Sequence, residues 1–174
     1  MATVTYKHQP GIHKTRGAVP LEGTAHLYRV KKVLWPSEIE SVLSRLLIPT
    51  SLHVCCGMSK LGDVRMDADE SLKPDVVGDA SKLRELFKHN EFRSVLCDPP
   101  YNGKMQWNHD LLNGLSYVAA KRIIFQHWFI PATKDGLWKK KQTKFYLSQL
   151  YVWQPRTYFG RVQVISVFDR VQHS

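Results

Sequence analysis

Residues 97–102, CDPPYN, bring together residue types that could form a compact chemical site. The carboxylate of Asp98 is a hydrogen-bond acceptor. Pro99 and Pro100 have a restricted φ and no backbone N–H, so they form a rigid spacer. Tyr101 offers an aromatic face on which a flat ring can stack. The segment therefore combines an acceptor, a rigid spacer and an aromatic platform.

This segment follows one of several short apolar runs that end on residues suited to chemistry. The runs are SLHVCCG (51–57), DVRMD (63–67), PDVVGD (74–79) and RSVLCD (93–98). Such runs are typical of strands buried in a parallel sheet. In open α/β sheets ligands bind at the carboxyl ends of the strands, so we expect the glycine turn and the three aspartates to share one edge. A single aspartate at a strand end is more often a turn residue, but four ordered ends favour a site.

The rest of the chain supplies the elements of an α/β sandwich. Apolar residues at helical spacing predict three helices, and further runs predict a buried strand and a closing hairpin. The helices are expected at about 36–47, 81–90 and 108–120, the strand at 122–130, and the hairpin at 149–155 and 161–170. Alternating strands and helices followed by two adjacent strands predict a mainly parallel sheet with a C-terminal antiparallel hairpin. We expect one domain over residues 1–174, with an irregular arm at 1–35 and no separate target recognition domain.

Composition narrows the class of protein. The 174 residues are 43% hydrophobic and 23% charged, and no apolar run approaches the ~20 residues of a membrane helix, so no membrane partner is expected. The N-terminus lacks the apolar stretch of a secretory signal, which favours a cytoplasmic location. The net charge of +10 favours a polyanionic partner such as nucleic acid. Three cysteines without a CxxC pair predict no metal site and are interpreted as small buried apolar residues.

A basic segment near the C-terminus is the candidate for nucleic-acid contact. It reads WKKKQTK at 138–144, and its candidate residues are Trp138, Lys139, Lys140, Lys141 and Lys144. The lysines could hold phosphates while the ring contacts a base or sugar. The alternative is a solvated charged face. His127, at the end of the strand expected at 122–130, could line a base pocket or simply pack beneath a loop.

The ordered motifs HVCCG, MD, VGDA and CDPPYN resemble those of the S-adenosylmethionine-dependent amino-methyltransferases of nucleic acids. This is the DPPY-type family that methylates adenine N-6 or cytosine N-4. The resemblance covers residues 51–102 by motif and 103–170 by strand order, and it does not extend to residues 1–50. It implies a Rossmann-like class I methyltransferase fold with S-adenosyl-L-methionine as the cofactor.

The resemblance also implies roles for individual residues. Cys56 and Gly57 would approach the methionine part of the cofactor, and Asp67 would accept hydrogen bonds from its ribose. Asp79 and Ala80 occupy the position that reads the adenine edge of the cofactor. The catalytic tetrapeptide would be Asp98, Pro99, Pro100 and Tyr101, with Asp98 also beside the cofactor.

The implied activity is methyl transfer to an exocyclic base amine, with adenine N-6 in DNA as the first expectation. The alternatives are an RNA amino-methyltransferase for adenine or guanine, and a non-catalytic partner subunit that binds cofactor or nucleic acid. The missing target recognition domain could mean relaxed sequence specificity, a partner subunit, or specificity carried by the N-terminal arm and the basic segment. The possible protein partners are a partner subunit or a second copy in a homodimer. The chain also departs from the family after Gly57: nine residues precede Asp67, too few for the usual helix.

Overall fold

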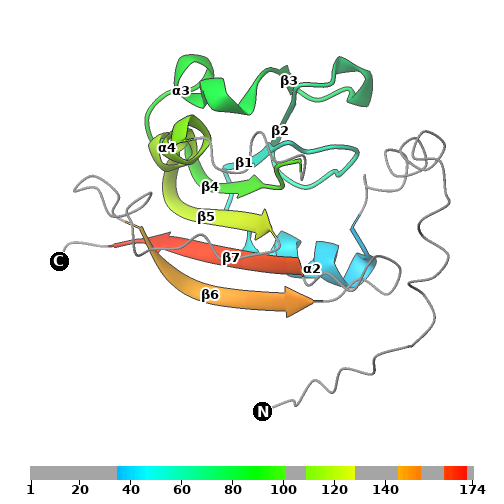
Figure 1. The fold of residues 1–174 in the computed structure, drawn as a ribbon, viewed down its shortest axis with the longest axis vertical. Coiled ribbons are helices and arrows are strands. Elements are labelled where there is room, and N and C mark those ends of the chain that lie inside the picture. Colours follow the sequence, from blue (N-terminus) through cyan, green and yellow to red (C-terminus); the bar gives the residue numbers. More distant parts are fainter. Residues whose placement is uncertain (1–34, 101–108, 128–144, 154–162, 172–174) are drawn as a thin grey trace, which may run out of the picture. The chain divides into compact units, whose positions relative to one another are not determined.

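The computed structural model describes residues 35–100, 109–127, 145–153 and 163–171. Residues 1–34, which include most of the expected irregular arm, lie outside the described residues. The described part contains a seven-stranded sheet in the order β3-β2-β1-β4-β5-β7-β6 (Figure 1). The strands are β1 Ser51–Val54, β2 Val64–Asp67, β3 Val76–Val77, β4 Phe92–Cys97, β5 Ala119–His127, β6 Phe145–Trp153 and β7 Gln163–Arg170.

Strand directions define the fold class. β1 is parallel to β2 and β4, β2 is parallel to β3, and β4 is parallel to β5. β7 is antiparallel to both of its neighbours, β5 and β6. A parallel sheet that ends with β7 inserted between β5 and β6 is the Rossmann-like class I methyltransferase arrangement. The predicted fold class and the C-terminal hairpin are confirmed.

The helices cover both faces of this sheet (Figure 1). They are α2 Ser37–Leu46, α3 Leu83–Leu86 and α4 His109–Val118, with short 3-10 turns η1 Glu70–Leu72 and η2 Ala80–Lys82. α2 forms where predicted, because Leu43 and Leu46 recur at helical spacing and are buried. Glu38 and Glu40 in its first turn and Arg45 in its last suit the helix dipole.

The two faces of β5 separate the core into two clusters. Ile123 and Phe125 belong to the cluster beneath α3 and α4, together with Leu83, Leu111 and Leu115 among others. Ile124 faces the other way and packs with Leu43 and Leu46 of α2 and with Ile165 and Val167 of β7. This period-two alternation makes β5 a strand buried on both faces. None of the described helices is long and apolar enough to cross a membrane.

Several element boundaries differ from the sequence-based expectation. The first strand stops at Val54 rather than Gly57, because Cys55 adopts a left-handed φ of 57°. The helix expected over 81–90 shortens to η2 and the four residues of α3, because Phe87 is extended. β6 begins at Phe145, four residues before the expected start of the hairpin, and the expected turn at 156–160 lies outside the described residues.

The connection from β1 to β2 contains no helix, as the spacing predicted. Residues 55–63 make only turns and bends. Leu61 packs against the α2 cluster, and its carbonyl oxygen lies 3.2 Å from Nδ1 of His53. The His53 ring also stacks on Trp35, with ring centroids 5.3 Å apart. The crossover therefore covers the α2 face of β1 in place of a helix.

Gly62 makes this crossover possible, and we expect Gly62→Ala to be destabilising. Its φ of 92° is rarely adopted by residues with a side chain, and a Cβ there would lie 3.0 Å from the Cβ of His53 and 3.2 Å from the oxygen of Val64. The free energy of unfolding should fall by about 1–3 kcal/mol, measured by urea denaturation. Gly78→Ala is the control, since its Cβ would first meet the side-chain end of exposed Leu86, which can rotate away. Equal losses in both variants would contradict this account.

His53 should make the fold sensitive to acid. Burial lowers its pKa from 6.5 to about 4, an effect that the hydrogen bond to Leu61 only partly offsets. Between these two values the unfolded chain binds the proton and the folded chain does not. The contribution of His53 to the free energy of unfolding is therefore fully present above pH 6.5. It is lost as the pH falls toward 4, which lowers the free energy of unfolding by roughly 3 kcal/mol. In His53→Gln, which keeps a donor for Leu61 but does not titrate, the free energy of unfolding should depend less steeply on pH. An unchanged slope would contradict the assignment.

Candidate active site

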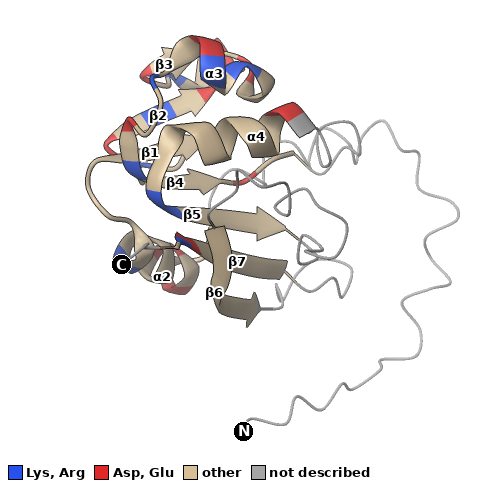
Figure 2. Cartoon of the chain, turned by 90° about the vertical axis from the view of Figure 1, so that its left-hand side faces the viewer, with Lys and Arg blue, Asp and Glu red and all other residues tan. Residues whose placement is uncertain are grey.

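The candidate site lies at the carboxyl edge of the sheet, where β1, β4 and β5 point the same way (Figure 2). After β1 the chain crosses the α2 face, because Leu61 packs there. After β4 the chain goes to α4, which packs on the opposite face. Neighbouring strands whose connections leave on opposite faces create a topological switch point, the usual ligand position in such sheets. Asp98 and the Cys55–Gly57 loop flank this point.

Asp98 follows β4 directly and is held against β1. Its backbone N–H donates to the carbonyl oxygen of Val54 at 3.3 Å, which prolongs the parallel pairing by one residue. The residue is half-buried, Pro99 is buried and Pro100 is exposed. The carboxylate is thus carried on a backbone that is fixed on both sides, by the β1 hydrogen bond and by two prolines. Tyr101, the expected stacking platform, lies outside the described residues.

The loop after β1 is tied to the end of β2. The Cys56 N–H donates to the Met66 carbonyl oxygen at 3.0 Å, and the Gly57 N–H donates to Oδ2 of Asp67 at 2.8 Å. The other oxygen of Asp67 accepts from the Asp69 N–H at 3.1 Å. Gly57 has a φ of 56°, which glycine tolerates without strain. The family resemblance implies that Asp67 binds a ribose. The structure adds that this carboxylate positions the loop of residues 55–57.

Asp79 and Ala80 follow β3 and begin η2. Oδ1 of Asp79 accepts from the Ser81 N–H at 2.8 Å, and hydrogen bonds from Ser81 lower the pKa of Asp79. Asp79 is exposed. Ala80 is buried and belongs to the core cluster beneath α3 and α4.

Three thiols lie next to these acids. Cys97 is the last residue of β4, and Cys55 and Cys56 follow β1. Burial, the neighbouring Cys55 thiol and the charge of Asp98 all raise the pKa of the Cys97 thiol well above its usual value. Burial and the charge of Asp67 raise the pKa of Cys56 to about 11. Cys56 and Cys97 are therefore neutral thiols at physiological pH.

His127 ends β5 on the α4 face, two residues beyond Phe125, which pairs with Cys97. Its ring stacks on Phe125 with centroids 5.9 Å apart, and it is buried. Burial lowers the pKa of His127 to about 4, so the ring is neutral at physiological pH. The strand places it level with Pro99, at the edge where sequence reasoning expected it.

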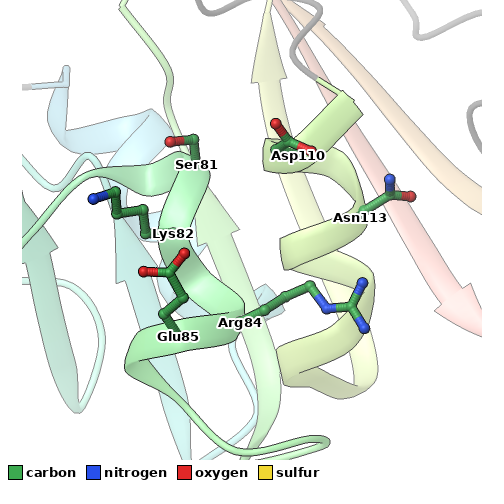
Figure 3. A pocket seen from close by; sticks show the side chains of 6 residues that line it. All are labelled: Ser81, Lys82, Arg84, Glu85, Asp110 and Asn113. Atoms are coloured by element: carbon green, nitrogen blue, oxygen red, sulfur yellow. The ribbon is translucent and has the colours of Figure 1, made fainter.

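A polar depression of about 420 Å³ opens between η2, α3 and α4 (Figure 3). It is lined by Ser81, Lys82, Arg84, Glu85, Asp110 and Asn113. Two acids, two bases and two neutral polar groups give this lining no preference for ligand charge. The sequence did not predict this depression, because its lining comes from two helices separated by β4. Ser81 connects it to the candidate site, since the Ser81 N–H binds Asp79.

The remaining predicted residues belong to the basic segment at 138–144. Trp138, Lys139, Lys140, Lys141 and Lys144 lie outside the described residues. Among the residues that are described, no three His, Cys, Asp or Glu side chains group as metal ligands would.

Comparison with known proteins gives only distant likenesses. No protein-family profile matches the chain, and no curated protein does. An rRNA methylase from Streptococcus thermophilus has a TM-score of 0.45 and 12% identity, over 80% of this chain and 99% of that one. A mutant of MtNAS has a TM-score of 0.44 and 15% identity, over 90% of this chain and 67% of that one. MtNAS in complex with MTA and tNA has a TM-score of 0.42 and 11% identity, over 78% of this chain and 58% of that one. The fold class is defined by strand order and direction, not by these likenesses.

Proposed function

We propose that this protein is an S-adenosylmethionine-dependent methyltransferase that modifies the exocyclic amine of a nucleic-acid base, adenine N-6 in DNA. One observation carries the proposal: Asp98, followed by Pro99 and Pro100, leaves β4 at the switch point beside the glycine loop of β1. An acceptor held this rigidly suits a reaction in which an amine must be oriented within a few tenths of an ångström.

The residues at the sheet edge fit the cofactor. Its sulfonium and ammonium groups are cationic, and Asp67, Asp79 and Asp98 provide carboxylates at the ends of three strands. Gly57 has no Cβ, which allows a ligand to approach the backbone. Asp67 already accepts two N–H groups, one on each oxygen, but a carboxylate oxygen has two acceptor sites and each can accept one more hydrogen bond. The bound cofactor supplies an electrophilic methyl group.

The amine nitrogen of a base is a weak nucleophile because its lone pair is delocalised into the ring. Asp98 accepts one amine hydrogen, and the Pro99 carbonyl oxygen accepts the other. Two acceptors on these hydrogens favour a pyramidal nitrogen, whose lone pair is then localised toward the methyl group. The positive charge that develops on nitrogen is stabilised by Asp98, which takes the proton. Tyr101 stacks on the base after it leaves its helix, and neutral His127 lines the neighbouring strand end.

The distribution of charge supports a nucleic-acid substrate. The described residues contain 11 Lys and Arg against 13 Asp and Glu, whereas the whole chain contains 25 against 15. Acidic and basic segments alternate on the described elements without a continuous basic stretch (Figure 2). The excess positive charge therefore resides in the other segments.

Three of these segments begin or end at the carboxyl edge. Residues 101–108 follow Pro100, residues 128–144 follow β5, and residues 154–162 join the end of β6 to β7. Together they contain eight Lys and Arg against one Asp, including the four lysines that follow Trp138. Such segments would hold the phosphates of a polyanion next to the otherwise acidic strand ends. The same distribution suits RNA, so the experiment includes both polymers.

The test is methyl transfer from S-adenosylmethionine labelled in its methyl group. The protein is incubated with separate DNA and RNA pools, and the products are digested to nucleosides. We expect label in N-6-methyl-2′-deoxyadenosine from the DNA pool and none with Asp98→Ala. Label only in the RNA pool would show that RNA, not DNA, is the substrate, and the proposed methyl transfer to a base amine would stand.

Absence of label would count against the enzyme. If calorimetry then showed cofactor binding, the chain would be a non-catalytic subunit that needs a partner. If no cofactor bound, the methyltransferase proposal would be wrong.

A further inference from the structure

Cys55 and Cys97 are brought together by the pairing of β1 with β4. Val54 and Cys97 are register partners in the parallel pair, and the next N–H along β4, that of Asp98, donates to the Val54 carbonyl oxygen. Cys55 therefore lies one residue beyond the partner of Cys97. Cys97 belongs to the core cluster beneath α3 and α4, and Cys55 packs against that same cluster, so both side chains lie on the same face of the sheet. Residues one step out of register on neighbouring strands have the Cα separation that disulfides require, roughly 4.4–6.8 Å.

Cys56 does not compete for this pairing. Its thiol donates to the carbonyl oxygen of Gly57 at 3.5 Å. Adjacent cysteines across a trans peptide have Cα atoms about 3.8 Å apart, closer than an unstrained disulfide allows. The left-handed φ of 57° at Cys55 reverses the chain at this point, directly after the strand. Of the three cysteines, Cys55 and Cys97 form the pair.

The two cysteines also differ in their exposure to solvent, which determines the thiol that is oxidised first. Cys55 is half-buried, whereas Cys97 is completely buried. An oxidant can thus reach Cys55 first. The buried Cys97 thiol can then react with the oxidised Cys55 to form the disulfide. Both residues directly adjoin the proposed machinery, since Cys97 precedes Asp98 and Cys55 is followed by Cys56 and Gly57.

We propose that Cys55 and Cys97 are an oxidisable thiol pair whose disulfide disables the proposed active site. A peroxide is the oxidant: the Cys55 sulfur takes one peroxide oxygen to give a sulfenic acid and one water. Cys97 then displaces the hydroxyl as a second water, and a sulfur–sulfur bond replaces two sulfur–hydrogen bonds. The new bond draws the start of the glycine loop onto the end of β4. It therefore moves the N–H groups of Cys56 and Gly57 away from Met66 and Asp67. The inhibition half of this proposal rests on the proposed function.

The test oxidises the full-length protein with hydrogen peroxide and, separately, with the azo oxidant diamide, which accepts the same two hydrogens. Thiols are then counted in denaturant, and peptides are mapped by mass spectrometry without reduction. The number of free thiols should fall from three to one. Peptide mapping should find residues 55 and 97 in one cross-linked peptide. The protein should remain monomeric on a non-reducing gel. Cys56→Ala should still form the cross-link, whereas Cys55→Ser should not and should retain two thiols. Dithiothreitol should reverse the change.

Cofactor binding is measured by calorimetry on the same samples. We expect the oxidised protein to bind S-adenosylmethionine at least tenfold more weakly than the reduced protein, and reduction to restore binding. Oxidised Cys55→Ser should bind as its reduced form does. An intermolecular cross-link, a Cys55–Cys56 bond or unchanged thiols would overturn the pairing, and a cross-linked protein with undiminished binding would overturn the inhibition. A reduced protein that binds no cofactor would instead count against the proposed function, while the thiol count would still decide the pairing.

Discussion

Replacing Asp98 with asparagine should lower kcat about a thousandfold at saturating cofactor. The amide keeps the size of the side chain but removes its negative charge, and it presents one acceptor where the carboxylate has two. The developing charge on the amine nitrogen is then unstabilised, and the proton has no acceptor. Asp98→Ala should be at least as inactive. The measurement is the initial rate of label transfer to an adenine-containing duplex.

Two comparisons separate this effect from a loss of structure. The Asp98 backbone N–H, which binds Val54, is unchanged in both variants, so their thermal unfolding should stay close to wild type. Glu38→Gln is the matched charge removal, because Glu38 is exposed in the first turn of α2 and far along the chain from the site. It should leave kcat unchanged. An Asp98→Asn variant that is folded and retains more than a tenth of the wild-type rate would exclude Asp98 as the catalytic acceptor.

Phe125→Ala should have the largest effect on stability, lowering the free energy of unfolding by about 3–5 kcal/mol. The ring is only 1% exposed, and its residue pairs with Cys97 on one side and Ser166 on the other. Removing it loses apolar burial and leaves a cavity beneath the stacked ring of His127. The free energy of unfolding of a native domain is only about 5–15 kcal/mol in total. Much of this variant should therefore be unfolded at moderate urea concentrations.

Two further variants show whether burial is the cause. Phe125→Leu keeps most of the apolar volume, so its free energy of unfolding should fall less than that of the alanine variant. Val152→Ala removes a side chain that is 60% exposed on β6, and its effect should stay within about 0.5 kcal/mol. Urea denaturation of all three proteins gives the comparison. A loss below 1 kcal/mol in Phe125→Ala would show that the cluster around β5 repacks freely.

Local sequence patterns predicted much of the fold. The strand ends at Asp67 and before Asp98 were predictable because an apolar run followed by a carboxylate cannot stay buried. The missing helix after Gly57 was predictable from nine residues of spacing alone. The lengths of β3 and α3 could not be predicted. The end of β3 depends on its pairing with β2, and the end of α3 depends on the backbone angles at Phe87. Propensity does not encode such tertiary constraints.

The sequence by itself determined the order of the elements, the residue types at each strand end and the rigid Asp98-Pro99-Pro100 unit. Only the tertiary structure decided which strand ends are neighbours. β1 pairs with β4 although β2 and β3 intervene in the chain, and this pairing places Cys55 one residue beyond the register partner of Cys97, against the same core cluster. The hydrogen bond from Gly57 to Asp67 likewise depends on the path of the crossover. The physical reason is that side-chain periodicity specifies the face that a residue occupies, whereas strand adjacency is set by burying apolar faces and pairing backbone groups over the whole sheet.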